Sequence, residues 1–102
     1  MDKREAINVA KKYLVLLGSK DISVENAYLF GSYARGNFHK DSDIDLAIIM
    51  KDVENEYLTQ LELMQLTLDV DLRIEPHVID KSDINSWNPL ASEVLKYGIK
   101  IN

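Results

Sequence analysis

The sequence is poor in several residue types, and each shortage excludes a class of protein. It has no cysteine, which excludes disulfide bonds and thiolate metal sites. No apolar run approaches the roughly 20 residues that a membrane-spanning helix needs. Basic residues are scarce relative to acidic ones, with 12 Lys+Arg against 17 Asp+Glu and a net charge of −5. Because a dedicated DNA- or RNA-binding protein normally carries a basic face, the charge argues against that function.

What is present fits one small globular domain. The length of 102 residues predicts a single domain over residues 1–102, and an apolar fraction of 46% is enough for one core. The N-terminal stretch is charged and amphipathic, and it lacks the apolar region and small-residue cleavage site of a signal peptide. Together with the absence of cysteine, this predicts a cytoplasmic protein.

The spacing of apolar residues predicts both helices and strands. Helices are predicted over residues 2–17, 53–68 and 89–97, and strands over 27–30, 44–50 and 70–79, with a short last strand at 99–101. The predicted order of the main elements is α-β-β-α-β-α. This order is typical of an α/β fold of the two-layer α+β kind, in which helices pack on a small mixed sheet.

Two of these elements carry more detailed predictions. In the helix over 53–68, four apolar residues share one face, which predicts that this face packs in the core. They are Tyr57, Leu61, Met64 and Leu68. Asp52 is a candidate N-cap for the same helix. In the strand over 70–79, Pro76 indicates a sheet edge or a bulge.

Two aspartates open the predicted strand over 44–50. Asp43 and Asp45 are two positions apart, so their side chains lie on the same side of the strand, about 6–7 Å apart. Two ionised carboxylates at that distance repel each other and need a cation. Oxygen ligands favour Mg²⁺ or Mn²⁺ over zinc. A carboxylate pair with one or two divalent ions is the equipment of phosphoryl or nucleotidyl transfer, because the ions neutralise phosphate charge and activate a hydroxyl.

A Gly-Ser pair supplies a complementary group for phosphate. The strand ending at Phe30 is followed at once by Gly31 and Ser32, where a turn or helix begins. Backbone N–H groups and a hydroxyl then lie at the sheet edge, where they suit a phosphate. Arg35, shortly after, could contact phosphate or support the loop. We therefore predict that these three residues bind a nucleotide.

A third carboxylate is expected from another strand. Asp71 is the first choice, because it follows the second predicted helix and lies on the polar face of its strand. Glu75 lies on the same face and competes for the role. Either could be the third metal ligand or the base that deprotonates a hydroxyl nucleophile. His77 shares that face and could orient Glu75.

These motifs bring a known family into view. Gly-Ser followed by Asp-x-Asp resembles the DNA polymerase beta-like nucleotidyltransferase superfamily, and the run Gly-Ser-Tyr-Ala-Arg-Gly…Ser-Asp-Ile-Asp-Leu resembles its minimal nucleotidyltransferase (MNT) branch. The resemblance covers nearly the whole chain. It implies a polymerase beta-type fold and a Mg²⁺-dependent transferase that uses ATP. Asp43 and Asp45 match the paired metal ligands, which are catalytic residues in the family, and Asp71 matches the third carboxylate.

The resemblance also implies a partner. Short members of this branch are commonly paired with a separate helical HEPN protein, which is often an RNase toxin, and the MNT protein is then the antitoxin. The implied reaction is AMP transfer from ATP to a hydroxyl, a tyrosine of the HEPN toxin. No nucleic-acid or membrane partner is expected, and a homo-oligomer is compatible with the sequence. Two alternatives stay open: an antitoxin that acts by occlusion without catalysis, and transfer to a small molecule such as an aminoglycoside.

Overall fold

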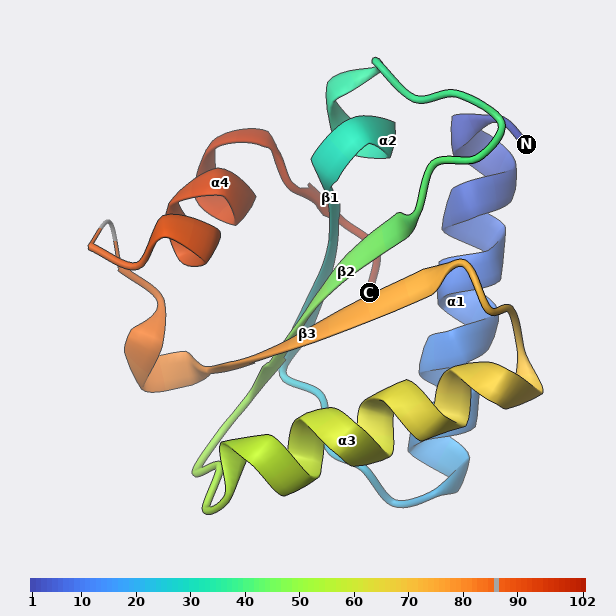
Figure 1. Ribbon diagram of the computed structural model, residues 1–102. Coiled ribbons are helices and arrows are strands. Elements are labelled where there is room, and N and C mark those ends of the chain that lie inside the picture. Colours follow the sequence, from blue (N-terminus) through green and yellow to red (C-terminus); the bar gives the residue numbers. More distant parts are fainter. Residues whose placement is uncertain (86) are drawn as a thin grey trace.

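A mixed sheet of four strands organises the chain (Figure 1). In the computed structural model, which describes residues 1–85 and 87–102, the strand order is β3-β2-β1-β4. β1 (Asn26–Phe30) runs antiparallel to β2 (Ile44–Met50) and to β4 (Ile99–Lys100), whereas β3 (Ile74–Asp80) runs parallel to β2. The predicted fold class, including the short last strand, is confirmed.

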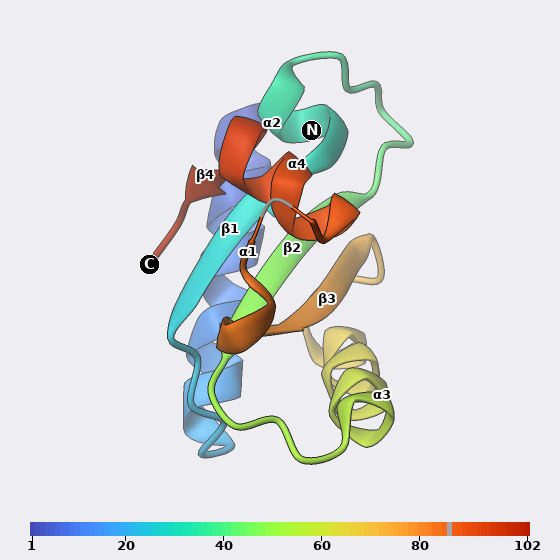
Figure 2. The same ribbon diagram turned by 90° about the vertical axis from the view of Figure 1, so that its left-hand side faces the viewer.

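Helices cover both faces of this sheet (Figures 1 and 2). They are α1 (Lys3–Ser19), α2 (Gly31–Arg35), α3 (Glu56–Leu66) and α4 (Pro89–Tyr97), with short 3₁₀ helices η1 (Thr67–Asp69) and η2 (Lys81–Asp83). The main core joins α1, α3 and one face of the sheet, and a smaller one lies under α4. Within the described ranges, no helix is long and apolar enough to cross a membrane.

β2 is buried on both faces, as a strand between two layers must be. Leu46 and Ile48 belong to the main core, whereas Ala47 and Ile49 belong to the smaller core under α4. Their alternation follows from the two-residue period of a strand. The strand predicted over 44–50 is therefore correct in its bounds and in its central position, and it fixes the position of the aspartates at its start.

The third predicted strand is wrong at its beginning. β3 starts at Ile74 rather than at residue 70, because the chain continues from α3 into η1 and then turns. In that turn, the Asp71 carboxylate accepts a hydrogen bond from the backbone N–H of Arg73 at 2.9 Å, and the Asp71 carbonyl accepts one from Ile74. Aspartate favours such turns because its short side chain caps the backbone two residues on. The predicted edge position of the strand is correct.

The predictions for the second long helix also need correction. Asn55, not Asp52, caps α3, and its side chain accepts a hydrogen bond from Leu58 N at 3.0 Å. The apolar face predicted to be buried is exposed instead, and its four residues all face away from the core. The buried side of α3 carries Leu63.

The reason is that α3 packs against the open edge of β3, which needs polar partners. The side-chain amide of Gln60 donates to the Pro76 carbonyl at 2.6 Å, and its oxygen accepts from the Val78 N–H at 2.8 Å. One glutamine thus pairs two backbone groups that a further strand would otherwise satisfy. The orientation of α3 follows these hydrogen bonds together with the burial of Leu63.

We predict that Gln60→Ala destabilises the protein by about 1–3 kcal/mol, because two partly buried backbone groups lose their partners. Urea unfolding followed by circular dichroism measures the change. Gln65→Ala, at an exposed position of the same helix, is the matched control and should leave the midpoint nearly unchanged. Equal midpoints for the two variants would show that Gln60 does not hold α3 on the sheet.

Candidate active site

Gly31 forms the junction between β1 and α2. Its φ of 72° lies in the left-handed region, where glycine is favoured. A Cβ at this position would collide with the Oδ2 atom of Asp45 on the neighbouring strand. The backbone of Gly31 therefore passes directly against one of the predicted metal ligands, and this contact requires glycine. The predicted turn or helix after Phe30 is present as α2.

The loop between α2 and β2 is anchored at two points. Phe38 stacks on the buried ring of Tyr33, with centroids 4.6 Å apart and an interplanar angle of 18°. The hydroxyl of the buried Ser42 accepts a hydrogen bond from His39 N at 2.8 Å. These contacts close the loop immediately before Asp43 and so position that carboxylate. Sequence reasoning missed them, although an aromatic residue in an otherwise polar loop was a usable signal.

Parallel pairing of β2 with β3 assembles the carboxylate cluster. Asp45 is paired with Glu75, and Ala47 with His77. Asp45, Glu75 and His77 each offer one atom that could bind a metal, and these three atoms lie within 4.8 Å of one another. His77 Nε2 is 3.5 Å from Asp45 Oδ1. Asp43, the residue before β2, joins this group, since it lines one cavity together with Glu75 and raises the pKa of that side chain.

The carboxylates of the cluster lie close enough to affect one another's charge, and a cation would offset their repulsion. Burial raises the pKa of Glu75, and the hydrogen bond with Asp43 and the charge of Asp45 raise it further, whereas His77 opposes the shift. His77 Nε2 is buried and has no hydrogen-bond partner among the described residues. Three carboxylates are donors that Mg²⁺ and Mn²⁺ accept. The residues present therefore fit a divalent ion.

Asp71 lies outside this cluster. Its carboxylate binds the Arg73 guanidinium through two hydrogen bonds of 3.0 and 2.7 Å. This guanidinium holds the pKa of Asp71 below its usual range. Of the two candidates for the third carboxylate, the structure brings Glu75, and not Asp71, to the aspartates. His77 lies beside Glu75 on the same strand, as predicted.

The predicted nucleotide-binding residues share a cavity with the aspartates. Its volume is about 320 Å³, and its lining includes Gly31, Ser32, Arg35, Asn37, His39, Asp41, Asp43 and Asp45. Arg35 also forms an ion pair with Glu93 of α4, at 3.0 Å. The Arg35 guanidinium thus lies between the cavity and α4. It can tie α2 to α4 and still present its positive charge to the cavity. Sequence reasoning missed Glu93, because no local pattern relates residues this far apart.

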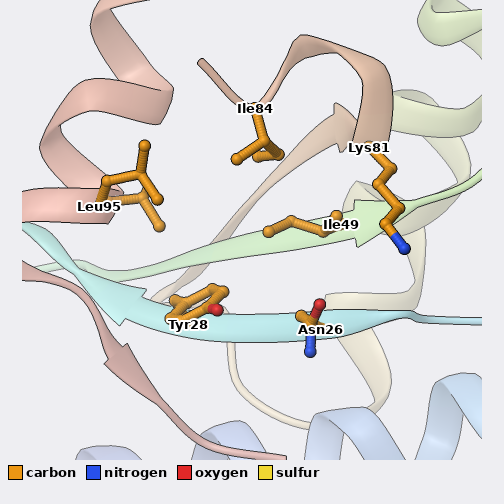
Figure 3. Close-up of a pocket in the computed structure, with 7 residues that line it drawn as sticks. Asn26, Tyr28, Ile49, Lys81, Ile84 and Leu95 are labelled. Carbon is orange, nitrogen blue, oxygen red and sulfur yellow. The ribbon is translucent and has the colours of Figure 1, made fainter. Parts of the chain in front are cut away.

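A separate cavity of about 300 Å³ lies between α4, η2 and the sheet (Figure 3). Tyr28 and Ile49 line its floor, and Leu95 and Ile84 border it from other elements. Among the described residues that line it, none is a carboxylate or a histidine. Of the two cavities, only the first is therefore lined by candidate metal ligands, Asp43 and Asp45.

The site combines three features: two aspartates at the start of β2, a third carboxylate on the parallel strand β3, and a Gly-Ser turn that packs against Asp45. This combination is typical of nucleotidyl transfer. The family model described as Polymerase beta, Nucleotidyltransferase matches residues 12–102. The chain therefore belongs to this nucleotidyltransferase family, and the resemblance seen in its motifs is confirmed.

Individual relatives agree with this assignment. The chain is 29% identical over 107 residues to the putative protein adenylyltransferase MJ0141 of Methanocaldococcus jannaschii, covering 95% of this chain and 99% of that one. It is 38% identical over 66 residues to the protein adenylyltransferase MntA of Shewanella oneidensis, covering 60% of this chain and 47% of MntA. A crystal structure of a toxin–antitoxin complex with AMP-PNP aligns with a TM-score of 0.64 and 27% identity, covering 89% of this chain and 71% of that one.

We predict that Gly31→Ala costs at least about 1–2 kcal/mol, because alanine in a left-handed conformation is strained even before its Cβ meets Asp45. Thermal unfolding measures the loss. Gly18→Ala is the control, since a Cβ there has no neighbour within 4 Å, and it should be neutral or stabilising by up to about 1 kcal/mol. A Gly31→Ala variant as stable as the wild type would contradict the close approach to Asp45.

Proposed function

We propose that this protein transfers AMP from ATP to a hydroxyl of a protein partner, a tyrosine of a HEPN toxin, and thereby acts as an antitoxin. The observation that carries the proposal is the cluster of Asp43, Asp45 and Glu75 next to Gly31 and Ser32. Membership of the nucleotidyltransferase family supports the reaction type. The names of the relatives, which are protein adenylyltransferases, support a protein as the acceptor.

In this proposal, Asp43, Asp45 and Glu75 would hold the divalent ion, Mg²⁺ or Mn²⁺. When bound, such an ion neutralises phosphate charge and lowers the pKa of an attacking hydroxyl. Asp71 is not assigned to this role, because its carboxylate is already paired with Arg73. The choice of Glu75 rests on its pairing with Asp45 across the two parallel strands.

The remaining residues bind the nucleotide and position its phosphates. The hydroxyl of Ser32 and the first backbone N–H groups of α2 border the cavity and donate to phosphate oxygens. Arg35 faces the same cavity and adds a positive charge. The fixed loop ending at Ser42 keeps Asp43 in place while phosphate charge approaches. The residues that bind and orient the nucleotide are thus close together in the sequence, whereas the third carboxylate comes from β3.

The transfer itself forms one bond and breaks one. The acceptor oxygen attacks the α-phosphorus in line, the bond from that phosphorus to the oxygen bridging toward the β-phosphorus breaks, and pyrophosphate leaves. The hydroxyl proton needs a carboxylate nearby. Glu75 suits this role because its pairing with Asp45 places its carboxylate beside the aspartates.

The test is transfer of label from α-labelled ATP, with Mg²⁺, to the protein encoded next to this one in the genome. We predict that Asp43→Asn combined with Asp45→Asn lowers transfer a hundredfold or more. Removing a residue that only hydrogen-bonds to a metal ligand already costs about 10–100-fold, and here the two proposed ligands themselves are changed. Asp41→Asn is the control, because this exposed residue borders the same cavity outside the cluster. It should retain transfer.

Two outcomes would contradict the proposal. Full activity of the double variant would remove Asp43 and Asp45 from the site. A stable complex of the two proteins without any label would instead support neutralisation by occlusion.

A further inference from the structure

The exposed apolar residues of α3 and η1 form a continuous stripe. The α3 stripe consists of Tyr57, Leu61, Met64 and Leu68, which are exposed by 74%, 42%, 51% and 70%. Their spacing of four, three and four residues is the spacing of a helix seam that packs on another helix. Leu72, also exposed, continues the stripe beyond η1. Figure 2 shows α3 at the rim of the molecule beside β3.

Within the described residues, the stripe belongs to neither core. α3 contacts the rest of the molecule through Leu63 and Leu66 in the main core and through Gln60 on the edge of β3. The Leu63 carbonyl also accepts a hydrogen bond from the Tyr13 hydroxyl at 2.6 Å. The helix therefore directs a partly polar side inward and its most apolar side outward. Contiguous apolar surface of this kind marks an interaction site on a soluble protein.

The α3 stripe borders the active site at two points. A cavity of about 240 Å³ is lined by Met64 and Leu72 together with Asp43 and Glu75. A second, of about 440 Å³, is lined by Tyr57 together with His77. A chain lying along the stripe would therefore place its side chains beside the third carboxylate.

The charge around the stripe selects the kind of partner. Residues 52–72 contain six acidic residues and no basic one. Five of the six are exposed, namely Asp52, Glu54, Glu56, Glu62 and Asp69, and the sixth, Asp71, is paired with Arg73. A second copy of this chain would bring the same acidic rim and be repelled, whereas a partner with basic residues beside its apolar face is attracted.

We infer that the α3 stripe docks an amphipathic helix of the protein acceptor, one with apolar residues at the same spacing and Lys or Arg beside them. The docked helix presents the acceptor hydroxyl to Glu75. This last step rests on the proposed function, whereas the docking of a basic amphipathic helix does not. The inference therefore names the surface and the chemistry by which the acceptor is recognised.

Two synthetic peptides of about 20 residues, long enough to form a helix, test the docking. Both carry leucines at heptad spacing, flanked by lysines in one and by glutamates in the other. In fluorescence anisotropy at low salt, the lysine peptide should bind the intact protein about tenfold or more tightly than the glutamate peptide. The difference should shrink at high salt, because exposed charges are screened.

Leu61→Gln combined with Leu68→Gln should weaken the lysine peptide about tenfold or more, since two buried leucines are lost from the contact. Tyr57→Gln combined with Met64→Gln is a second, independent pair with the same expected loss. Val15→Gln, on the exposed side of α1, is the matched control and should leave binding unchanged. The rise in melting temperature with MgATP should be the same in all variants, which shows that each is folded with its nucleotide site intact.

Several results would overturn the inference. These are failure of the lysine peptide to bind, equal binding of both peptides, and unchanged binding in both stripe variants. Self-association of the wild type that the stripe variants abolish would identify a second copy as the occupant instead. If AMP transfer fails but peptide binding depends on the stripe, the docking surface stands and the proposed function falls.

Discussion

The parallel pairing of β2 with β3 is the constraint on which the site depends. Parallel strands begin at the same edge of a sheet, so Asp45 and Glu75 become neighbours although 30 positions separate them in the chain. A shift of one residue would turn Glu75 to the opposite face and leave Asp45 beside an apolar side chain. The repulsion within the carboxylate cluster is thus imposed by backbone pairing, and it makes the edge a place for a cation.

The same pairing requires α3. Two parallel strands cannot be joined by a tight turn, so the chain needs a crossover connection, which here is a helix. Because β3 is the outer strand, this helix lies against an open edge and uses Gln60 to satisfy it. The apolar stripe of α3 is then left outside, next to the carboxylates. The connection that builds the active site therefore also exposes the surface where we place the acceptor.

Features set by nearby residues could be predicted from the sequence. The strand over 44–50, the two aspartates at its start and the Gly-Ser junction all follow from local spacing. Which of Asp71 and Glu75 lies beside the aspartates could not be predicted, because it depends on where the helical segment ends and on the turn that Asp71 makes with Arg73. The orientation of α3 was equally out of reach. Apolar periodicity identified the most apolar side of the helix, but that side is not the one that packs. The packing side is set partly by the hydrogen bonds of Gln60 to the edge of β3, and no local sequence pattern reveals that edge.

The most direct test of this account is a Mn²⁺ titration followed by electron paramagnetic resonance, with the wild type, Glu75→Gln and Asp71→Asn compared. If parallel pairing builds the metal site, Glu75→Gln should weaken Mn²⁺ binding by about tenfold or more, as loss of a carboxylate ligand implies. Asp71→Asn should bind Mn²⁺ as the wild type does, because Asp71 is held by Arg73. The opposite pattern, with Asp71 essential and Glu75 dispensable, would contradict the central claim.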